Sequence, residues 1–309
     1  MRELSAKALP GKSLVVLAPS LKLATDIFPC EDAYTQERAL FPEVLKTIQP
    51  GQLWIADRNM CTLGFLFGVK KRQATCLVRQ HKSMPYEAIS KLQSLGKKET
   101  GELFEQTVRI IYNGESLLLR RIVLKLFKPT RDGHKEIALL TWLPVTVANA
   151  ATVAELYQGR WSVEHLFQTV TDNFEGEIQT LAYPKAALFS FCMAIVAYNI
   201  LAVVRAALGS VHGAGKIEAG LSDFYLVNEV QGVYRGMMIA IPPSHWTIFS
   251  TLSPTQLTDL LQGLAANVRL KAFLKQPRKP KKKKPPLIVD PKHRHFSTAR
   301  ILAASKKTP

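Results

Sequence analysis

The order of elements in the first sixty residues is the feature that most constrains the fold. Three short apolar runs in this stretch are typical of buried strands. Between the second and the third run, apolar side chains recur at helical spacing, and Pro50-Gly51 ends this helical pattern. The expected order is strand, strand, helix, strand, at residues 12–18, 22–29, 36–48 and 52–56. Asp57 follows directly after the last strand. This order predicts a mixed α/β fold with a carboxylate at one end of its sheet.

A second constraint comes from the polar residues between positions 157 and 171. Tyr157, Arg160, Glu164 and Thr171 are separated by three, four and seven residues. These offsets place side chains on one stripe of an α-helix, so the spacing predicts a single helix with a phenol, a guanidinium and a carboxylate in line. The same spacing is also typical of a solvated helix face on which Arg160 and Glu164 form a pair worth about 0.2–0.5 kcal/mol.

The rest of the chain favours a functional role for this stripe. The motif Tyr157-x2-Arg160-x3-Glu164 resembles the signature of bacterial DDE transposases of the insertion-sequence-four family. The run Leu-Trp-Ile-Ala-Asp-Arg-Asn at residues 53–59 is similar to the second acidic motif of the same family. The resemblance covers the chain from about Lys12 to about Ala207.

The chain departs from the family pattern at two places. Thr171 stands where the signature has a Lys, and no residue matches the first catalytic Asp of the family. The ribonuclease-H-like fold that the resemblance implies begins with three antiparallel strands, and the first strand carries that Asp. This sequence predicts only two strands before the helix, and neither Asp26 nor Asp32 fits the role by its position. We therefore expect an N-terminally truncated member of the family.

The resemblance also implies a chemistry and the residues that perform it. Asp57 and Glu164 are expected to be catalytic and to hold Mg²⁺ or Mn²⁺, hard cations that prefer carboxylate oxygens. Tyr157, Arg160 and Arg58 are expected to contact DNA beside the reacting phosphate, Arg160 through a bidentate grip. The expected function is that of a transposase catalytic domain for cut-and-paste transposition by metal-dependent phosphoryl transfer. Because the first Asp is absent, we expect this chain to be inactive as given.

The expected organisation has five parts. After Asp57 the sequence changes to strand patterns separated by turn signals such as Asn113-Gly114. These strands are expected at residues 64–70, 75–81, 103–112, 116–127 and 136–143, with later helices at 221–227 and after a cap at Ser253. The five parts are the start of a ribonuclease-H-like core at 1–64, a β-rich insertion at 65–146, core completion with the Glu-bearing helix at 147–210, a C-terminal helical region at 211–274 and a disordered basic tail at 275–309.

The charge of the chain points to a polyanionic partner. The net charge is +17 and the pI is about 9.8, with +11 of that charge in residues 275–309. A net charge this basic favours nucleic acid or an anionic membrane surface as the binding partner. The resemblance implies DNA, namely transposon ends and target, bound by a homodimer or a higher synaptic assembly in the bacterial cytoplasm at the nucleoid. The alternatives are a non-enzymatic DNA-binding remnant or regulator of transposition, and a membrane-associated protein.

Cysteine usage and one apolar run bear on localisation. The four cysteines form no C-x-x-C pair and the first residues contain no apolar signal region, so we expect reduced thiols in a cytosolic protein. Residues 186–204 carry no formal charge and are long enough to span a membrane. Ser190, Tyr198 and Asn199 dilute this run, and its small residues suit close packing, so we expect a buried helix and no membrane partner.

Overall fold

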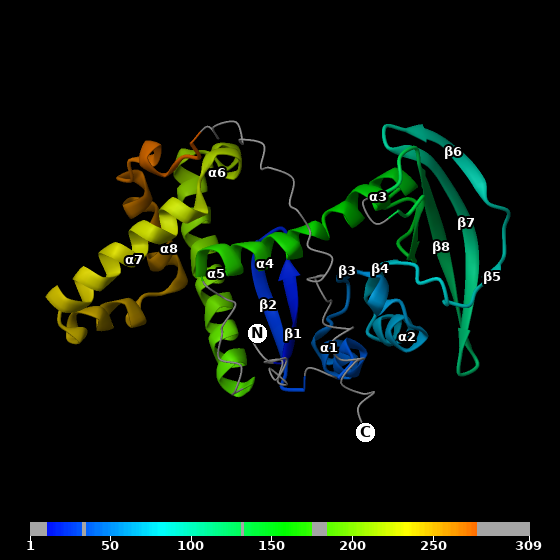
Figure 1. Ribbon diagram of the computed structural model, residues 1–309, viewed down its shortest axis with the longest axis horizontal. Coiled ribbons are helices and arrows are strands. Elements are labelled where there is room, and N and C mark those ends of the chain that lie inside the picture. The colour runs from blue at the N-terminus through cyan, green and yellow to red at the C-terminus, as the bar shows by residue number, and fades with distance from the viewer. Residues whose placement is uncertain (1–10, 33–34, 131–132, 175–183, 277–309) are drawn as a thin grey trace, which may run out of the picture.

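The computed structural model describes residues 11–32, 35–130, 133–174 and 184–276. The structure is mixed α/β, which confirms the predicted fold class. A two-stranded sheet lies at the centre, a larger sheet with its helices lies on one side of it, and a group of helices lies on the other (Figure 1). The basic tail lies outside the described residues from position 277 onwards.

The central sheet pairs the first two predicted strands. β1 (Lys12–Ala18) and β2 (Leu23–Cys30) are antiparallel, and the long helix α5 (Pro184–His212) packs against β2. Asn199 of α5 donates its amide hydrogen to the carbonyl oxygen of Ala24 at 2.9 Å and accepts the Ala24 N–H at 2.8 Å. This polar residue of an otherwise apolar helix therefore satisfies the main chain of β2.

The larger sheet has seven strands in the order β3-β4-β9-β8-β7-β5, and β6 also pairs with β7. β3 and β4 are parallel, and the other pairs are antiparallel. The strands are β3 (Leu53–Ala56), β4 (Thr75–Arg79), β5 (Glu87–Ala88), β6 (Gln93–Lys98), β7 (Gly101–Tyr112), β8 (Glu115–Leu126) and β9 (Glu136–Thr141). The strands predicted at 52–56, 75–81, 103–112, 116–127 and 136–143 are thus confirmed to within a few residues.

The strand predicted at residues 64–70 is wrong, because this segment is the helix α2 (Leu63–Lys71). Thr62 caps the helix by accepting the Phe65 N–H at 3.3 Å. Three consecutive side chains, Phe65 to Phe67, are buried, so the run is apolar on every side and has no periodicity that separates a helix from a strand. The parallel pairing of β3 with β4 requires a crossover connection, and α2 supplies it.

Helices cover both faces of the strand that leads to Asp57. Trp54 of β3 packs in the same apolar cluster as α1 (Phe41–Thr47) and α2, whereas Leu53 packs with α3 (Ala150–Gln158). Alternate residues of β3 thus face opposite helices, as a strand buried on both faces requires. The helix predicted at 36–48 is confirmed as a 3₁₀ turn, η1 (Glu37–Leu40), followed by α1.

The single helix predicted through positions 157–171 is wrong in one respect, because the segment forms two helices. α3 ends before Gly159 and Arg160, and α4 (Trp161–Phe174) begins after them. The junction is held by 3₁₀-type hydrogen bonds between residues three positions apart, such as that from the Arg160 N–H to the Tyr157 carbonyl oxygen at 3.1 Å. Gly159 lowers the helix propensity at this point, and a 3₁₀ turn replaces a regular α-helical turn.

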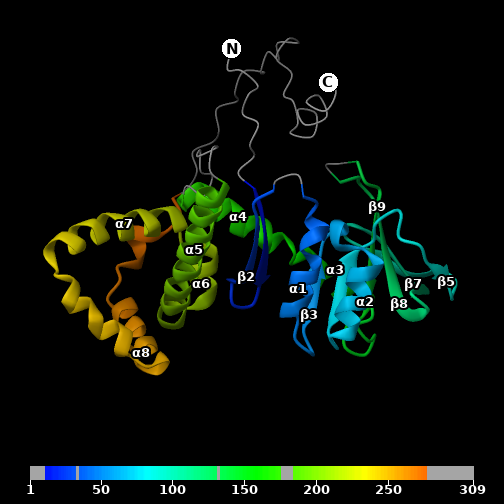
Figure 2. The ribbon, with the colours of Figure 1, turned by 90° about the horizontal axis from the view of Figure 1, so that it is seen from below.

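A group of helices completes the described chain. Phe167 of α4 stacks on Phe191 of α5 with 6.3 Å between ring centroids. The remaining elements are α6 (Ala214–Gly220), α7 (Asp223–Ala240), η3 (Pro243–Thr251), α8 (Pro254–Ala266) and η4 (Leu270–Phe273). α8 begins as predicted, with a capping box between Ser253 and Gln256, and the short helix predicted at 221–227 is the start of the longer α7. α7 reaches outward from this group, and α8 leads back to pack against α5 (Figure 2).

In the described part of the chain, α5 is covered on one face only. Its exposed apolar side chains recur every three or four residues, at Phe189, Met193, Val196, Ile200 and Val203. Among the described residues, α5 is the one helix long and apolar enough to cross a membrane by length and composition, and 33% of its most apolar 18-residue window is buried. The buried helix expected from the sequence is therefore covered only on the side that packs against β2, α4 and α8.

Candidate active site

The first part of the site lies where β3 ends. Asp57 follows Ala56 and caps a short 3₁₀ turn, η2 (Arg58–Met60), because its Oδ1 accepts the Asn59 N–H at 2.8 Å. The Asp57 side chain is partly buried. The turn therefore fixes a carboxylate at the carboxyl end of a strand whose parallel neighbour, β4, ends at the same edge.

The second part of the site lies at the α3–α4 junction. Tyr157 is in the last turn of α3, Arg160 is at the junction, and Glu164 is in the first turn of α4. Nη1 of Arg160 donates to Oε1 of Glu164 at 2.6 Å. The guanidinium carbon lies 5.8 Å from the ring centroid of Tyr157 and 5.5 Å from that of Trp161. Arg160 is therefore held by one carboxylate and two aromatic rings.

Electrostatic interactions join the two parts. Burial raises the pKa of Tyr157 above its usual value; the charges of Arg160 and Arg79 lower it, and the charge of Asp57 raises it further. Burial acts to lower the pKa of Arg160, but the hydrogen bond to Glu164 and the charges of Tyr157, Glu164 and Asp57 raise that pKa overall. Asp57 and Glu164 therefore act on the same guanidinium. At pH 7 Arg160 is charged and the Tyr157 phenol is neutral.

Two buried atoms at this junction lack a hydrogen-bond partner, namely Nε of Arg160 and Oε2 of Glu164. A free carboxylate oxygen suits a hard divalent cation, and a free guanidinium N–H suits a phosphate oxygen or another carboxylate. Within the described ranges, no group of three or more His, Cys, Asp or Glu side chains is placed to hold a metal ion. Oε2 of Glu164 is thus one carboxylate oxygen open to a cation, and the described residues around it form no complete metal site.

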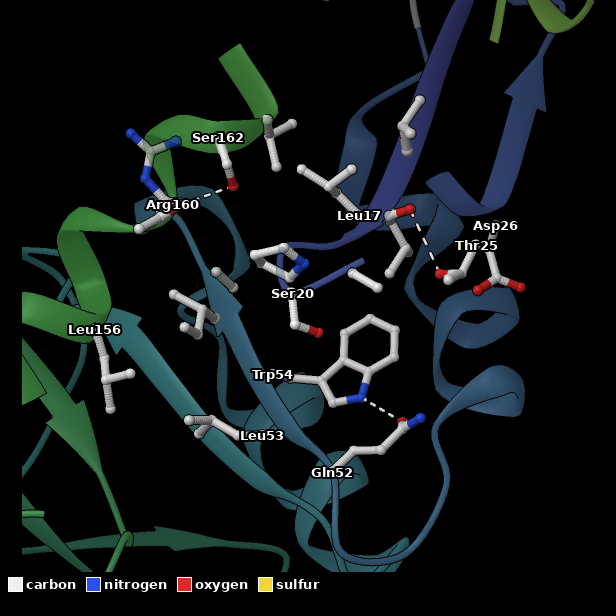
Figure 3. A pocket seen from close by; sticks show the side chains of 18 of the residues that line it. Leu17, Ser20, Thr25, Asp26, Gln52, Leu53, Trp54, Leu156, Arg160 and Ser162 are labelled. Atoms are coloured by element: carbon white, nitrogen blue, oxygen red, sulfur yellow. Dashed lines mark hydrogen bonds between the residues drawn. The ribbon is translucent and has the colours of Figure 1, made fainter. Parts of the chain in front are cut away.

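Arg160 also lines a groove of about 810 Å³ between β1 and β3, which we call the β1–β3 groove. Its walls include residues 14–18 of β1, residues 53–56 of β3 and part of the α3–α4 junction. Figure 3 shows Leu17 of β1, Trp54 of β3 and Leu156 of α3 around the same space as Arg160. The groove therefore reaches the residue on which Asp57 and Glu164 act.

Basic side chains gather in a second cavity of about 480 Å³, which we call the basic pocket. The guanidinium carbon of Arg121 lies 5.3 Å from the ring centroid of Tyr86, and Nε of Arg121 donates to Oε1 of Gln80 at 2.7 Å. Five Lys and Arg side chains line the pocket, and none forms an ion pair with any described residue: Arg58, Arg79, Lys82, Arg121 and Lys135. Unpaired cations around one cavity suit a polyanion such as a DNA backbone.

Of the five site residues predicted from the sequence, the structure places Tyr157, Arg160 and Glu164 together at the α3–α4 junction, and the charge of Asp57 acts on Tyr157 and Arg160. The fifth, Arg58, lines the basic pocket instead. Arg79 is a site residue that the sequence analysis does not single out: it lines the same pocket, and its charge acts on Tyr157. The sequence position of Arg79 could have identified it, because Arg79 is the last residue of β4, the buried strand that comes after the strand leading to Asp57.

The chain is similar to known proteins. The family described as "Transposase DDE domain" matches residues 26–200, a range that contains Asp57, the basic pocket and the α3–α4 junction. A protein of Sinorhizobium fredii (strain NBRC 101917 / NGR234) with the name "Putative transposase y4zB" is 26% identical to this chain over 163 residues. The match covers 50% of this chain and 43% of that relative, so the chain spans less than half of the relative's length.

Proposed function

We propose that this chain, which belongs to the transposase DDE domain family, provides a catalytic domain that acts on a DNA phosphate during transposition. One observation carries the proposal: Arg160 is hydrogen-bonded to Glu164 at 2.6 Å, and its Nε–H and Oε2 of Glu164 are buried with no partner among the described residues. The charge of Asp57, from the end of β3, also acts on this guanidinium. The two carboxylates come from segments far apart in the sequence, and a shared cationic partner between them suits phosphate chemistry.

Each residue of this site has a proposed role. Asp57 and Glu164 would hold a divalent cation, Mg²⁺ or Mn²⁺, which when bound activates an attacking oxygen and stabilises a leaving oxygen at phosphorus. Arg160 would grip a phosphate oxygen through its free Nε–H, while its Nη1–H stays on Glu164. Tyr157 is neutral at pH 7, so its phenol can donate a hydrogen bond to the same phosphate.

The basic pocket extends the proposal to the path of the DNA. Arg58 follows Asp57 directly, and Arg79 acts on Tyr157, so both connect the carboxylate site to the pocket. A DNA backbone that crosses the site would therefore meet further unpaired cations. We assign phosphate contacts to Arg58 and Arg79, and further contacts to Arg121 and its neighbours in the pocket.

We also propose that the chain belongs to the insertion-sequence-four branch and does not transpose as given. The Tyr157–Arg160–Glu164 spacing supports the branch. The pair of carboxylates supports the lack of activity, because two ligands leave a cation under-coordinated. The departures from the family pattern described above, Thr171 included, agree with the lack of activity.

The experiment combines DNA binding with a test for cleavage. Binding of a fluorescent duplex is measured at several salt concentrations, and nicking of supercoiled plasmid is measured with Mg²⁺ and with Mn²⁺. We expect binding that weakens as salt rises and no nicking. Metal-dependent nicking or strand transfer would contradict the proposed lack of activity, and an absence of binding would contradict the DNA partner.

A second candidate function is that of a non-enzymatic DNA-binding regulator of transposition. The observation in its favour is that the basic pocket holds five unpaired cations, whereas the cation site holds only two carboxylates. A regulator of this kind would lower the activity of a complete transposase with the same ends in proportion to its amount. Mixing the two proteins in a strand-transfer reaction distinguishes this function from catalysis.

We propose that the chain self-associates on DNA, as a homodimer or a higher assembly, through the second half of α7. Every residue from 228 to 240 is exposed, so nothing in the described chain covers this part of the helix. Its large apolar side chains are Val230, Val233, Tyr234, Met237, Met238 and Ile239. An exposed apolar helix face of this kind is typical of an interface. Sedimentation with and without DNA measures the assembly.

The five-part organisation and the location at the nucleoid also stay proposals. Limited proteolysis tests the boundaries near residues 64, 146, 210 and 274. Cell fractionation tests the location, and recovery of the chain in the membrane fraction would favour a membrane role for α5.

A further inference from the structure

α5 presents an apolar stripe that the described chain leaves exposed. Its side chains are spaced alternately by four and three residues, which is typical of a helix that packs lengthwise on a second helix. Residues 186–204, which contain the stripe, include no charged side chain. This α5 stripe therefore suits an uncharged face of another helix. Its five side chains have exposed fractions between 43% and 67%: Phe189, Met193, Val196, Ile200 and Val203.

The second half of α7, residues 228–240, carries a similar surface, and we call it the α7 arm. The first half of the helix is anchored in its own copy. Asp223 pairs with Arg205 of α5, and both Leu226 and Val227 are buried. Every residue of the arm is exposed, and α7 reaches outward from the helical group (Figure 2). The arm is therefore fixed at one end and uncovered by the described chain along its length.

The stripe and the arm match in pattern and in length. At about 3.6 residues per turn, four apolar side chains of the arm fall on one side of the helix, and Gly232 and Gly236 fall on the opposite side. At a rise of about 1.5 Å per residue, the stripe is about 21 Å long and the arm about 18 Å long. The two surfaces can therefore pack along their whole length. The four side chains of the arm are Val230, Val233, Tyr234 and Met237.

We propose that two copies of the chain exchange α7 arms, so that the arm of each copy packs lengthwise on the α5 stripe of the other. Within one copy the arm and the stripe do not cover each other, because both are exposed. The exchange is symmetric, since each copy both donates an arm and accepts one, so the assembly closes as a dimer. This inference rests on the proposed self-association through α7 and names the surface that receives that helix.

The area of exposed apolar surface favours this exchange over a contact of each helix with its own counterpart. The stripe has five and the arm six large apolar side chains, with exposed fractions between 36% and 90%. At roughly 150–200 Å² for a whole side chain of this size, they expose on the order of 900 Å² per copy. A specific interface buries about 800 Å² per partner. A contact of α5 with α5, or of α7 with α7, covers about half of the available surface, so the exchange reaches the required size and neither of those contacts does.

Single charged substitutions test the two sides of the contact. Val196→Glu lies at the centre of the α5 stripe and Tyr234→Lys near the centre of the arm, and both positions are exposed, so the fold should be preserved. Sedimentation of the full chain, with and without duplex DNA, measures self-association. Each variant should weaken it at least tenfold, because both contacts of the dimer then bury an unpaired charge. Val145→Glu, at a position 59% exposed and outside both helices, should leave it unchanged.

A mixture of the two charged variants is a sharper test. In a dimer of one Val196→Glu copy and one Tyr234→Lys copy, one contact brings the two opposite charges together and the other contact contains neither substitution. The mixture should therefore associate at least fivefold more tightly than either variant alone. The proposal is overturned if the mixture associates no more tightly than the separate variants, or if Val196→Glu associates as the unmodified chain does.

Cross-linking separates this inference from the proposed self-association. Cys30→Ala and Cys192→Ala remove the two partly exposed thiols. In this background one copy carries Val196→Cys, and a copy with a different tag carries Tyr234→Cys. A bis-maleimide reagent should link the two kinds of copy to each other. Links between like copies only would overturn the exchange, and a link between two Tyr234→Cys copies would leave self-association through α7 standing. If nothing links and the unmodified chain does not associate with or without DNA, both proposals fail.

Discussion

Replacing Glu164 by Gln separates a structural role of this carboxylate from a cation-binding one. The Arg160–Glu164 pair is 2.6 Å long, but the Glu164 side chain is 41% exposed and the Arg160 side chain 22% exposed. A partly exposed i,i+4 pair contributes less than about 1 kcal/mol after solvent screening. One kcal/mol shifts the Tm of a domain of 150–250 residues by about 2–4 °C. Glu164→Gln should therefore lower the Tm by no more than about 4 °C.

The effect on cation binding should be larger. A cation present at about 100 times its Kd stabilises the folded state by about 2.7 kcal/mol, which corresponds to a rise in Tm of about 5–10 °C. Glu164→Gln removes the carboxylate whose Oε2 is free, so Mn²⁺ should no longer raise the Tm of the variant. The measurement is a thermal melt followed by intrinsic fluorescence across a Mn²⁺ titration, with the unmodified chain alongside.

Glu43→Gln is the matched control. It breaks another exposed ion pair of the same length, 2.6 Å to Lys46, in a helix away from the site. This variant should keep the whole Mn²⁺ response. The reasoning is refuted if Glu164→Gln keeps that response too. A fall in Tm of more than about 10 °C without Mn²⁺ would show instead that the carboxylate is chiefly structural.

Further predictions concern the basic pocket, the packing of β7 and the buried thiols. Arg121→Ala should weaken duplex binding and lower the slope of log K against log salt by about 1, whereas Lys46→Ala outside the pocket should change neither, as measured by anisotropy at four salt concentrations. Gly101→Ala should destabilise the fold by about 1–3 kcal/mol in urea melts, because its Cβ would lie 2.2 Å from a main-chain oxygen of β8; Gly232→Ala, in the open part of α7, should instead stabilise it by about 0.5–1 kcal/mol. Burial raises the pKa of the Cys76 thiol, so this thiol should react with Ellman's reagent at pH 8 only after unfolding. Since its folded pKa exceeds the unfolded one, its contribution to stability is present at pH 7 and is lost as the pH rises above the unfolded value.

Local signals in the sequence predicted most of the strands and the capped helices. β3 was predictable because a short apolar run follows the turn signal Pro50-Gly51, and α8 because Ser253 precedes Pro254. α2 was not, because four buried residues fall within five consecutive positions, from Phe65 to Val69, and give no clear period. The break before α4 was not predicted either. The polar stripe continues across it at helical spacing, and only Gly159 marks the place where the hydrogen bonds tighten.

Tertiary contacts decide which side chains join the site. Asp57 and Glu164 could be named from the sequence because a motif surrounds each of them. Arg121 could not, since basic residues that alternate along a strand serve equally well as a solubilising face. Its role follows from the cavity that it shares with Arg58 and Arg79, whose segments meet only when β3, β4 and β8 lie in one sheet.

The break between α3 and α4 also explains the gap between the two sheets. α3 packs on the larger sheet, at β4, β7 and β8, whereas α4 packs on β1. The junction at Gly159 and Arg160 therefore bridges the groove between β1 and β3. The same tight turn directs Arg160 into the groove wall while its guanidinium stays on Glu164. A change that straightens the junction, such as Gly159→Ala, should therefore disturb both the spacing of the sheets and the carboxylate site, and hydrogen exchange in β1 and β3 would report the first of these effects.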